Sequence, residues 1–371
     1  MRVLLAAGVF PPELGGPATY AKIISEELRK RGTSVDVLPF RDARRFPKII
    51  RHIAYVTMLA KRARGTDVIF AQDPVSVGLP ALIISKLYGT KFVLRVAGDY
   101  AWEQGVQRFH VAENLDQFAG HTRPLFSPVG ILQRIQSRVA RSAACVVVPS
   151  RYFAGIVEKW GVPRERIVVV YSAFVSHMAI AENEEELRVR LDLSYPSILS
   201  AGRLVPWKGM STLVEIMPEL VRDNKDATLI IAGDGPEREK LKELVREKHL
   251  ERRVRFLGAL PQETLFEYVK ASDIFVLNTG YEGLSYQLLE VMAIGTPIIT
   301  TNVGGNPELI ESGREGVLVS YNNKTELLVA IKEVLSDSAR TQVRIAAAKR
   351  KVIEFSTQRM VEGTIKVLKA L

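Results

Sequence analysis

The feature that most constrains the fold is a repeated change of hydrophobic pattern along the chain. Short apolar runs without alternation are separated by longer segments with helical periodicity, and this exchange continues through both halves of the sequence. Apolar runs of this kind are typical of strands that are covered on both faces. Helices between such strands imply right-handed crossovers and parallel sheets. The pattern therefore predicts doubly wound α/β domains.

The strand candidates divide evenly between the two halves. In the first half they are Val3–Ala7, Val35–Leu38, Val68–Ala71, Phe92–Val96, Cys145–Val148 and Ile167–Tyr171. In the second half they are Ser197–Ala201, Thr228–Ala232, Val254–Leu257, Ile274–Leu277, Ile298–Thr300 and Gly316–Val319. Ligands of such sheets bind beyond the carboxyl ends of the strands, so two such domains are expected to share a cleft.

A chain of 371 residues is long for a single core and predicts two domains. We place the first domain at residues 1–175 and the second at residues 176–355, with a linker from Ser172 to Pro196 and a final helix at residues 356–371. No apolar run approaches the roughly 18 residues of a membrane span. The apolar start is followed by Pro11-Pro12-Glu13 instead of a cleavage site, which favours a buried first strand over a signal peptide.

The positive charge is concentrated in the first half. Residues 1–175 hold 25 basic and 13 acidic residues, whereas the remaining residues hold 26 of the 51 basic and 28 of the 41 acidic ones. This asymmetry indicates a partner of the first half such as an anionic membrane surface or an anionic substrate. No nucleic-acid partner is expected.

The cysteine and histidine content predicts neither disulfides nor a metal site. Cys145, the single cysteine, stands in an apolar strand candidate, which favours a reducing compartment. The histidines have no metal-ligand spacing, and no Asp-x-Asp pair follows a strand. We therefore expect no metal and no cofactor. The expected location is the cytoplasm, with peripheral contact with the inner face of the membrane left open.

Two carboxylates mark the strongest candidate site. Glu282 precedes a helix predicted from Tyr286, which ends before Gly295-Thr296-Pro297, and Glu290 stands within that helix. Eight helical residues rise roughly 12 Å and return to nearly the same face. The backbone amides between the carboxylates, those of Gly283, Leu284 and Ser285, are expected to point at an anion. An elongated ligand with hydroxyls at its ends and charge in its middle, such as a nucleotide-sugar, fits this arrangement.

Two cations follow the first strand of the second half. Arg203 and Lys208, five residues apart on one loop, can converge on a multiply charged anion, with Arg supplying a planar fork and Lys a point charge. The alternative is that both are solvated loop cations. Gly15-Gly16 precedes a helix in the first half and could let the backbone approach a phosphate, or it could be a plain loop. Its spacing does not fit the Gly-x-Gly-x-x-Gly pattern of dinucleotide-binding enzymes.

Two further features of the first half have two interpretations each. Asp99 follows the fourth strand and either binds or deprotonates an acceptor hydroxyl, with Trp102 stacking on a sugar ring, or caps the next helix. The segment Arg41–Arg64 alternates basic and apolar residues. It is either an amphipathic helix on an anionic membrane or a core-packed helix with solvated basic ends.

Several motifs in this order resemble the family 4 glycosyltransferases, retaining enzymes with two Rossmann-like domains that face a cleft (the GT-B fold). The resemblance covers nearly the whole chain. Its motifs are Gly15-Gly16, Gly202-Arg203 with Lys208-Gly209, Gly233-Asp234-Gly235, Glu282-Gly283 with Glu290, Gly295-Thr296-Pro297, and Gly304-Gly305 with Pro307-Glu308.

The resemblance implies a role for each matching residue. Arg203 and Lys208 would hold the donor diphosphate, which would remove the need for a metal. Glu290 would accept hydrogen bonds from the ribose, and Glu282 would bind the transferred sugar near the amides of Gly283, Leu284 and Ser285. Gly15 and Gly16 would close over the diphosphate, and the final helix would cross back to the first domain.

The chain departs from the family pattern at three places. Ala97-Gly98-Asp99 stands where many members have a histidine, and Asp99 is the residue that could replace it. Ser172-Ala173-Phe174-Val175 replaces the usual Asn-Gly-Val-Asp, and Leu284-Ser285 replaces a frequent Phe-Gly. None of these changes removes an anion-binding group, so an active enzyme is expected.

The resemblance therefore predicts a retaining, metal-independent hexosyltransferase. It would move a sugar from a nucleoside-diphosphate donor, such as a UDP- or GDP-sugar, to a hydroxyl of a carbohydrate or lipid-linked acceptor in cell-envelope glycolipid or polysaccharide synthesis. The first domain would bind the acceptor and the second the donor. A nucleotide-sugar 2-epimerase of similar fold and a non-catalytic carbohydrate- or membrane-binding protein are the alternatives.

Overall fold

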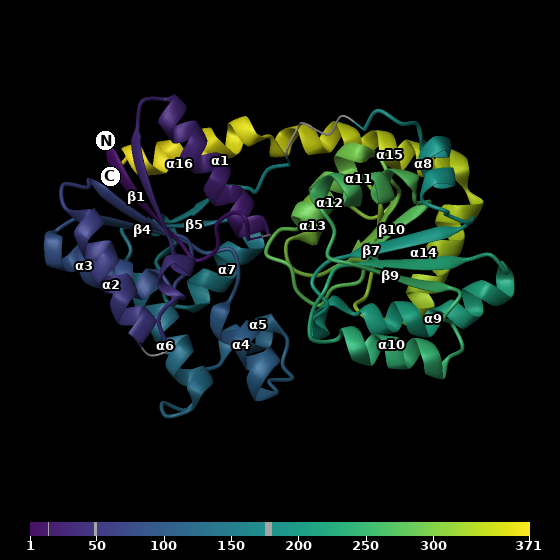
Figure 1. The fold of residues 1–371 in the computed structure, drawn as a ribbon, viewed down its shortest axis with the longest axis horizontal. Helices are drawn as coiled ribbons and strands as arrows, with labels where there is room; N and C mark the ends of the chain where they lie inside the picture. The colour runs from purple at the N-terminus through teal and green to yellow at the C-terminus, as the bar shows by residue number, and fades with distance from the viewer. Residues whose placement is uncertain (14, 48–49, 175–179) are drawn as a thin grey trace. The chain divides into compact units, whose positions relative to one another are not determined.

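The computed structural model describes residues 1–13, 15–47, 50–174 and 180–371, which form two compact units. The first unit comprises Met1–Ser172 and Thr357–Leu371, and the second comprises Ala173–Ser356 (Figure 1). Residues 48–49 of the basic segment Arg41–Arg64 and residues 175–179 of the predicted linker, Val175 among them, lie outside the described residues.

The first unit contains a parallel sheet with the strand order β2-β1-β3-β4-β5-β6 among its described residues. The strands are β1 (Arg2–Ala7), β2 (Ser34–Pro39), β3 (Val68–Ala71), β4 (Lys91–Arg95), β5 (Cys145–Val148) and β6 (Ile167–Val169). Strands β1, β3 and β5 are buried along almost their whole length, as expected of strands covered on both faces.

The second unit repeats this architecture with the strand order β12-β11-β10-β7-β8-β9, again with parallel pairing. Its strands are β7 (Ser197–Ala201), β8 (Thr228–Ala232), β9 (Val254–Gly258), β10 (Ile274–Leu277), β11 (Ile298–Thr301) and β12 (Val317–Val319). The predicted fold class is confirmed. The predicted strands differ from the observed ones only at their ends; for example, β6 ends at Val169 rather than at Tyr171.

Helices precede, connect and follow the strands of both units. In the first unit they are α1 (Gly16–Lys30), η1 (Phe40–Ala43), α2 (Ile50–Ala63), α3 (Gly78–Tyr88), α4 (Tyr100–Phe109), α5 (Leu115–Gly120), α6 (Pro128–Ser142), α7 (Arg151–Lys159), η2 (Arg164–Arg166) and α16 (Thr357–Lys369). In the second unit they are α8 (Glu184–Arg190), η3 (Pro206–Lys208), α9 (Met210–Asp223), α10 (Arg238–Glu247), α11 (Gln262–Ala271), α12 (Tyr286–Ile294), α13 (Asn306–Leu309), α14 (Lys324–Ser336), α15 (Ser338–Val352) and η4 (Ile353–Phe355). No described helix is long and apolar enough to cross a bilayer.

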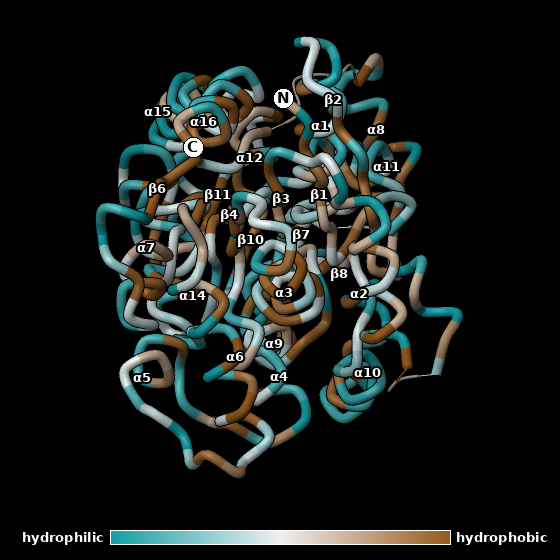
Figure 2. Tube along the Cα trace, turned by 90° about the vertical axis from the view of Figure 1, so that its left-hand side faces the viewer, coloured by the Kyte–Doolittle hydropathy of each residue, from teal (hydrophilic) through white to brown (hydrophobic). Residues whose placement is uncertain are grey.

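The core of the second unit lies between its sheet and the helices that cover it. Helix α9 contributes a buried stripe at helical spacing, Leu213, Met217 and Leu220, which belongs to the same apolar cluster as Ile198 of β7 and Ile231 of β8. Truncating one such side chain to Ala typically costs about 2–5 kcal/mol. In Figure 2 the charged helix α10 is mostly hydrophilic, whereas α3 of the first unit is largely hydrophobic.

In the first unit the last helix of the chain packs against the first. Figure 1 shows α16 beside α1, and the hydroxyl groups of Tyr20 and Thr364 are hydrogen-bonded at 2.8 Å. Both side chains are fully buried. This contact ties the end of the chain to its beginning and attaches α16 to the first unit.

Helix α2 supports the core-packed interpretation of the basic segment. Its buried residues, Tyr55, Leu59 and Ala63, follow one another at intervals of four, and the Tyr55 hydroxyl donates to the Leu38 carbonyl oxygen (2.8 Å). Ile50 and Ile53 nevertheless remain exposed, at 50% and 64%. One face of the helix is therefore part of the core while its beginning presents apolar side chains to the surface.

Candidate functional site

The carboxyl end of the second sheet brings two of the predicted site residues together. The Nζ of Lys208, which ends η3 after β7, donates to the Oε1 of Glu282, which lies on the loop after β10. The two side chains are only 13% and 15% exposed. Strands β7 and β10 are neighbours in the sheet, so the loops that follow them meet at one edge. The cation predicted to hold a diphosphate is thus paired with the carboxylate predicted to bind a sugar.

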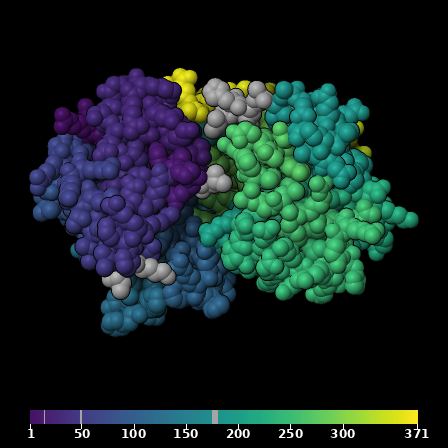
Figure 3. All heavy atoms as spheres, viewed as in Figure 1, coloured from purple at the N-terminus to yellow at the C-terminus, as the bar shows by residue number. Residues whose placement is uncertain are grey.

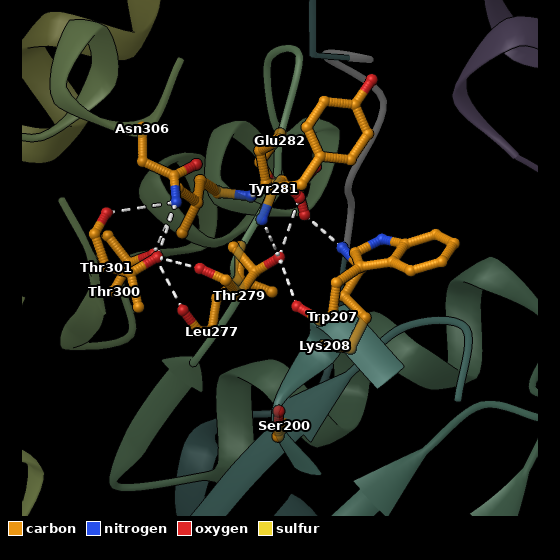
Figure 4. Close-up of polar contacts among 12 residues, drawn as sticks. Ser200, Trp207, Lys208, Leu277, Thr279, Tyr281, Glu282, Thr300, Thr301 and Asn306 are labelled. Atoms are coloured by element: carbon orange, nitrogen blue, oxygen red, sulfur yellow. Dashed lines mark hydrogen bonds and ion pairs between the residues drawn. The ribbon is translucent and has the colours of Figure 1, made fainter. Parts of the chain in front are cut away.

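The loop that carries Glu282 is fixed by buried hydrogen bonds (Figure 4). The Gly280 N–H donates to the Trp207 carbonyl oxygen (2.7 Å), which joins this loop to the Lys208 loop. The Thr301 hydroxyl donates to the Thr279 carbonyl oxygen (2.6 Å), and the Thr279 hydroxyl donates to the Tyr281 carbonyl oxygen (2.8 Å). Because Thr279 and Thr301 are fully buried, these bonds hold the position of Glu282 without solvent competition.

A pair of glycines lies directly behind the Glu282 backbone. A Cβ on Gly304 would come within 2.1 Å of the Glu282 carbonyl oxygen, and one on Gly305 within 2.3 Å of the Gly283 carbonyl oxygen. The Gly305 N–H donates to the Glu282 carbonyl oxygen (3.0 Å). Gly304 also has a φ of 62°, which favours glycine. The two glycines therefore serve the close packing of this loop.

The Lys208 loop has its own support from a strand end. The Asn278 side-chain amide, which is fully buried, donates to the Gly209 carbonyl oxygen and to the Asn322 Oδ1, both at 2.9 Å. The Thr212 hydroxyl donates to the same Asn322 oxygen (2.8 Å). These contacts fix the chain immediately after Lys208 and at the start of α9.

Helix α12 begins at the predicted Tyr286, ends at Ile294 just before Gly295, and positions the second carboxylate. The Ser285 hydroxyl caps its beginning by accepting from the Leu288 N–H (3.3 Å), and Gly295 ends it in the left-handed conformation. Glu290 is half-buried on this helix, and its Oε1 accepts from the Gln262 side-chain amide of α11 (2.7 Å). Burial raises the pKa of Glu290 to about 7, although the hydrogen bond from Gln262 lowers it.

The remaining donor-site candidates of the second unit differ in exposure. Arg203 is exposed on the loop after β7. Gly283, Leu284 and Ser285 are buried at the start of α12. The Ser285 side chain is used as the helix cap, so its hydroxyl already has a structural role.

The candidates of the first unit lie at helix beginnings. Gly15 is the N-cap of α1, has a φ of 129° and makes no side-chain cap bond, and Gly16 is the first residue of that helix. Asp99 is fully buried and caps α4, its Oδ1 accepting from the Trp102 N–H and the Gln136 amide, both at 2.9 Å. Burial raises the pKa of Asp99 to about 6, and these hydrogen bonds oppose the shift.

The structure thus supports the helix-cap interpretation of Asp99. Trp102 does not offer a stacking surface, because it is only 3% exposed and its indole N–H donates to the Glu113 carbonyl oxygen (2.8 Å). The suggestion that Trp102 stacks on a sugar ring is therefore wrong for this structure. Among the residues described, no group of His, Cys, Asp or Glu side chains is arranged to hold a metal ion.

Several residues that shape the site were not anticipated from the sequence. Gln262 pairs with Glu290, and Asn278, Thr279 and Thr301 hold the two loops. The available signal was positional, because Asn278-Thr279 and Thr300-Thr301 are polar pairs at the carboxyl ends of apolar strands. Gln262 had no such signal, since its contact with Glu290 bridges 28 positions of sequence.

Comparison with known families accounts for both units. Residues 182–352 match the family model of the glycosyl transferases group 1, and residues 5–173 match that of the glycosyl transferase 4-like domain. The chain belongs to the family 4 glycosyltransferases. An uncharacterized glycosyltransferase of Methanocaldococcus jannaschii is 25% identical over all of this chain and 98% of its own length. A GDP-mannose-dependent phosphatidylinositol monomannoside mannosyltransferase of Mycolicibacterium smegmatis is 24% identical over 91% of this chain and 90% of its own.

Solved structures of such enzymes have the same fold. Anabaena HepE, solved in complex with UDP-glucose, superposes with a TM-score of 0.80 at 19% identity, with full coverage of both chains. The sucrose-phosphate synthase of Thermosynechococcus elongatus superposes with a TM-score of 0.83 at 20% identity, covering all of this chain and 98% of its own. The family predicted from the motifs, and the GT-B fold that it implies, are confirmed.

Proposed function

We propose that this glycosyltransferase is a retaining enzyme that transfers a sugar from a nucleoside-diphosphate donor to an acceptor hydroxyl with an α-linkage. The observation that carries the proposal is the meeting of Lys208 and Glu282 at the carboxyl end of the second sheet. A cation for the diphosphate and a carboxylate for the sugar hydroxyls are held side by side there by loops that buried hydrogen bonds fix in place. Glu290, on the helix that begins beside Glu282, supplies the carboxylate for the ribose.

In the proposed complex, the donor replaces the Lys208–Glu282 ion pair with contacts of its own. The diphosphate takes Lys208 and the exposed Arg203, and the sugar hydroxyls donate to Glu282. The loss of one half-buried ion pair is offset because each partner gains a charge-assisted contact. The amides of Gly283, Leu284 and Ser285 and the Gly15-Gly16 backbone are the further proposed donor contacts.

The proposed mechanism proceeds on one face of the sugar. The bond between the anomeric carbon and the diphosphate oxygen breaks, and the acceptor oxygen attacks from the side that the diphosphate leaves. The acceptor proton passes to the departing diphosphate oxygen. Arg203 and Lys208 stabilise the charge that develops on the diphosphate, which is why we propose transfer without a metal ion. We propose that Asp99 positions α4 by capping it. A contact between Asp99 and the acceptor is a further proposal.

The relatives support a sugar nucleotide as the donor and an envelope component as the acceptor. HepE was solved with UDP-glucose, and the mycobacterial relative is named for GDP-mannose and a phosphatidylinositol mannoside. We propose a UDP- or GDP-hexose as the donor of the present enzyme and a carbohydrate or lipid-linked acceptor. The roles proposed for the domains are acceptor binding by residues 1–175 and donor binding by residues 176–355.

We further propose peripheral contact between the first unit and an anionic membrane on the cytoplasmic side. The charge excess of the first half supports it, as do exposed apolar side chains of this unit, including Ile53 (64%), Leu87 (69%) and Phe126 (90%). Phe126 lies just before α6, and α4, α5 and α6 form one end of the first unit in Figures 1 and 3. Apolar side chains among basic ones suit a lipid headgroup region.

The test of the proposed function is a donor screen followed by a product assay. A sugar nucleotide present at 100 times its Kd should stabilise the protein by about 2.7 kcal/mol, which a thermal-shift screen detects. Release of nucleoside diphosphate is then measured with and without acceptor. Acceptor-dependent release together with an α-linked product supports the transferase. Isomerisation of the donor without acceptor would indicate the 2-epimerase, and binding without turnover would indicate a binding protein.

A further inference from the structure

The Arg95 side chain is a buried cation that the proposed chemistry leaves unused. Arg95 is the last residue of β4 and has 0% exposure, the largest fully buried side chain among the described residues. None of its three guanidinium nitrogens has a hydrogen-bond partner within the described chain. A buried charge without an acidic partner is costly, because desolvation is not repaid by attraction or hydrogen bonding. Such a residue indicates a function other than stabilising the fold.

One face of the guanidinium is covered by an aromatic ring. Its carbon lies 3.7 Å from the centroid of Tyr20, a residue of α1 that is itself fully buried. The hydrogen bond between Tyr20 and Thr364 of α16 holds the ring in place. Stacking offsets part of the desolvation cost but satisfies none of the N–H groups, which point outward in the guanidinium plane. The Tyr20 ring therefore fixes the orientation of the Arg95 guanidinium and leaves its N–H groups without acceptors among the described residues.

A second buried polar side chain without a hydrogen-bond partner in the described chain follows the end of the neighbouring strand β3. In the register of β3 and β4, Ala71 pairs with Leu94, so Gln72 is the neighbour of Arg95 one step further along. Paired residues of a parallel ladder point to the same face of the sheet. Gln72 is 5% exposed, and neither its Oε1 nor its Nε2 has a partner within the described chain. The register thus places the Arg95 guanidinium and the Gln72 amide at the carboxyl ends of two neighbouring strands, on the same face of the sheet, and ligands of doubly wound sheets bind at these strand ends.

The acidic residues that follow the ends of β3 and β4, Asp73 and Asp99, each use one carboxylate oxygen at the beginning of a helix. The Oδ1 of Asp73 accepts from the N–H groups of Val75 and Ser76, at 2.9 and 2.5 Å, and opens the turn into α3. The Oδ1 of Asp99 caps α4. No ion pair joins Arg95 to an acidic side chain of the described residues. The guanidinium of Arg95 is therefore open to an anion from outside the described chain.

We propose that Arg95 and Gln72 form an oxyanion subsite, which receives a carboxylate or phosphoryl group carried by the acceptor. This inference rests on the proposed transferase function. The planar fork pairs with two oxygens of such a group, and the Gln72 amide donates to a third or to the same group. Because the nitrogens are buried, the anion binds with a local movement of the surrounding side chains. The enzyme would thereby select acidic acceptors over neutral ones.

The first test measures anion-dependent stability in the full chain. Inorganic phosphate and acetate are titrated into the wild type, Arg95→Met and Arg95→Lys, with thermal unfolding as the readout. Phosphate that binds in the donor site raises the unfolding temperature of all three proteins equally. Any difference in this rise between the proteins is therefore due to Arg95. We expect an additional rise on the order of 3–5 °C in the wild type at about ten times the Kd, absent in Arg95→Met and reduced in Arg95→Lys.

A matched control is Arg344→Met. Arg344 is also buried, but its Nη2 donates to the Glu333 carboxylate at 2.7 Å. Its replacement should lower the unfolding temperature without changing the response to anions. In contrast, Arg95→Met without anion should unfold at the wild-type temperature or higher. If Arg95→Met is destabilised and keeps the full anion response, Arg95 is a structural cation stacked on Tyr20 and the proposal is overturned.

The second test identifies the source of the anion. Transfer is compared for methyl glycosides that carry a neutral hydroxyl, a carboxylate or a phosphate at the same carbon. We expect at least about a tenfold preference in kcat/KM for an acidic acceptor, lost in Arg95→Met while the neutral acceptor is turned over as before. Equal use of all three acceptors by the wild type would overturn the acceptor assignment, even where free phosphate binds. Failure of the proposed function would instead abolish transfer to every acceptor and leave the stability test intact.

Discussion

At the scale of single residues, two charged groups of the proposed site, Lys208 and Glu282, form an ion pair within the protein. The sequence motifs indicated that Lys208 and Glu282 belong to one site, but not that they pair with each other. Motif spacing specifies which residues follow a strand end, whereas pairing depends on side-chain conformations set by the surrounding loops. The same reason explains why Asp99, which has a suitable position for chemistry, is used as a buried cap.

Replacement of Lys208 by Ala should lower the rate of transfer. Loss of one donor to a developing anionic charge typically costs about 10²–10³-fold in kcat. The half-buried Glu282 carboxylate would also lose its partner. The measurement is steady-state transfer with a saturating donor, with Lys225→Ala, an exposed lysine of the same unit, as the control. Turnover of the Lys208 variant within a few-fold of the wild type would remove this residue from the mechanism.

Donor binding should strengthen as the pH rises through about 7. Burial raises the pKa of Glu290 to about 7, and only the ionised carboxylate accepts from both ribose hydroxyls. The raised pKa acts on folding in the opposite sense: the protonated native state is favoured at low pH, and this stability is lost as the pH rises through 7. Calorimetric titration of donor at pH 6 and pH 8 measures the first effect. Glu290→Gln should abolish the pH dependence, and Glu263→Gln on the exposed turn of α11 should retain it.

At the scale of secondary-structure elements, prediction from the sequence was accurate because each element has a local cause. Strand β5 was predicted with its observed bounds from a continuous apolar run, and α12 from the helical run that begins at Tyr286 and the stop signal Gly295-Thr296-Pro297. Predictions of strand ends, such as that of β6, were less accurate, because a strand ends where its neighbour stops pairing with it. Contacts between elements, such as Gln262 with Glu290, have no local signal at all.

The basic segment before and within α2 should contribute to binding of anionic vesicles. Each Lys or Arg near an anionic surface is worth about 1 kcal/mol, so reversing Arg44, Arg45 and Arg51 to Glu should weaken binding by at least about a hundredfold. Arg44 already pairs with Glu13, so its contribution is the smallest of the three. The measurement is co-sedimentation with vesicles that contain phosphatidylserine.

The control for this experiment is a reversal of equal charge in the second unit. Arg222, Lys225 and Arg252 are exposed there and belong to the half of the chain without excess positive charge. Their reversal to Glu should leave vesicle binding within a few-fold of the wild type. Equal binding by both triple variants and the wild type would contradict membrane contact through α2.

At the scale of the whole molecule, the first unit is not one continuous stretch of the chain, because the last helix belongs to it. The strands divide cleanly at the middle of the sequence, and this division was predictable from the hydrophobic pattern. Helix α16 is last in the chain but packs in the first unit, through the contact of Thr364 with Tyr20. Periodicity predicts that residues 356–371 form a helix, but not which apolar surface this helix covers. That assignment came from the family resemblance alone.

A polar substitution in α16 should therefore destabilise the first unit although it lies at the end of the chain. Val361 is 0% exposed in the packed face of α16, so Val361→Asp buries a charge without a partner and should cost several kcal/mol. Hydrogen exchange is expected to rise in α1 and in the strands of the first sheet, while β7 and β8 stay protected. Val343→Asp is the matched control, because Val343 is 67% exposed on α15 and its replacement should change little. Increased exchange in the second unit alone would contradict this prediction, because it would show that α16 stabilises the second unit and not the first.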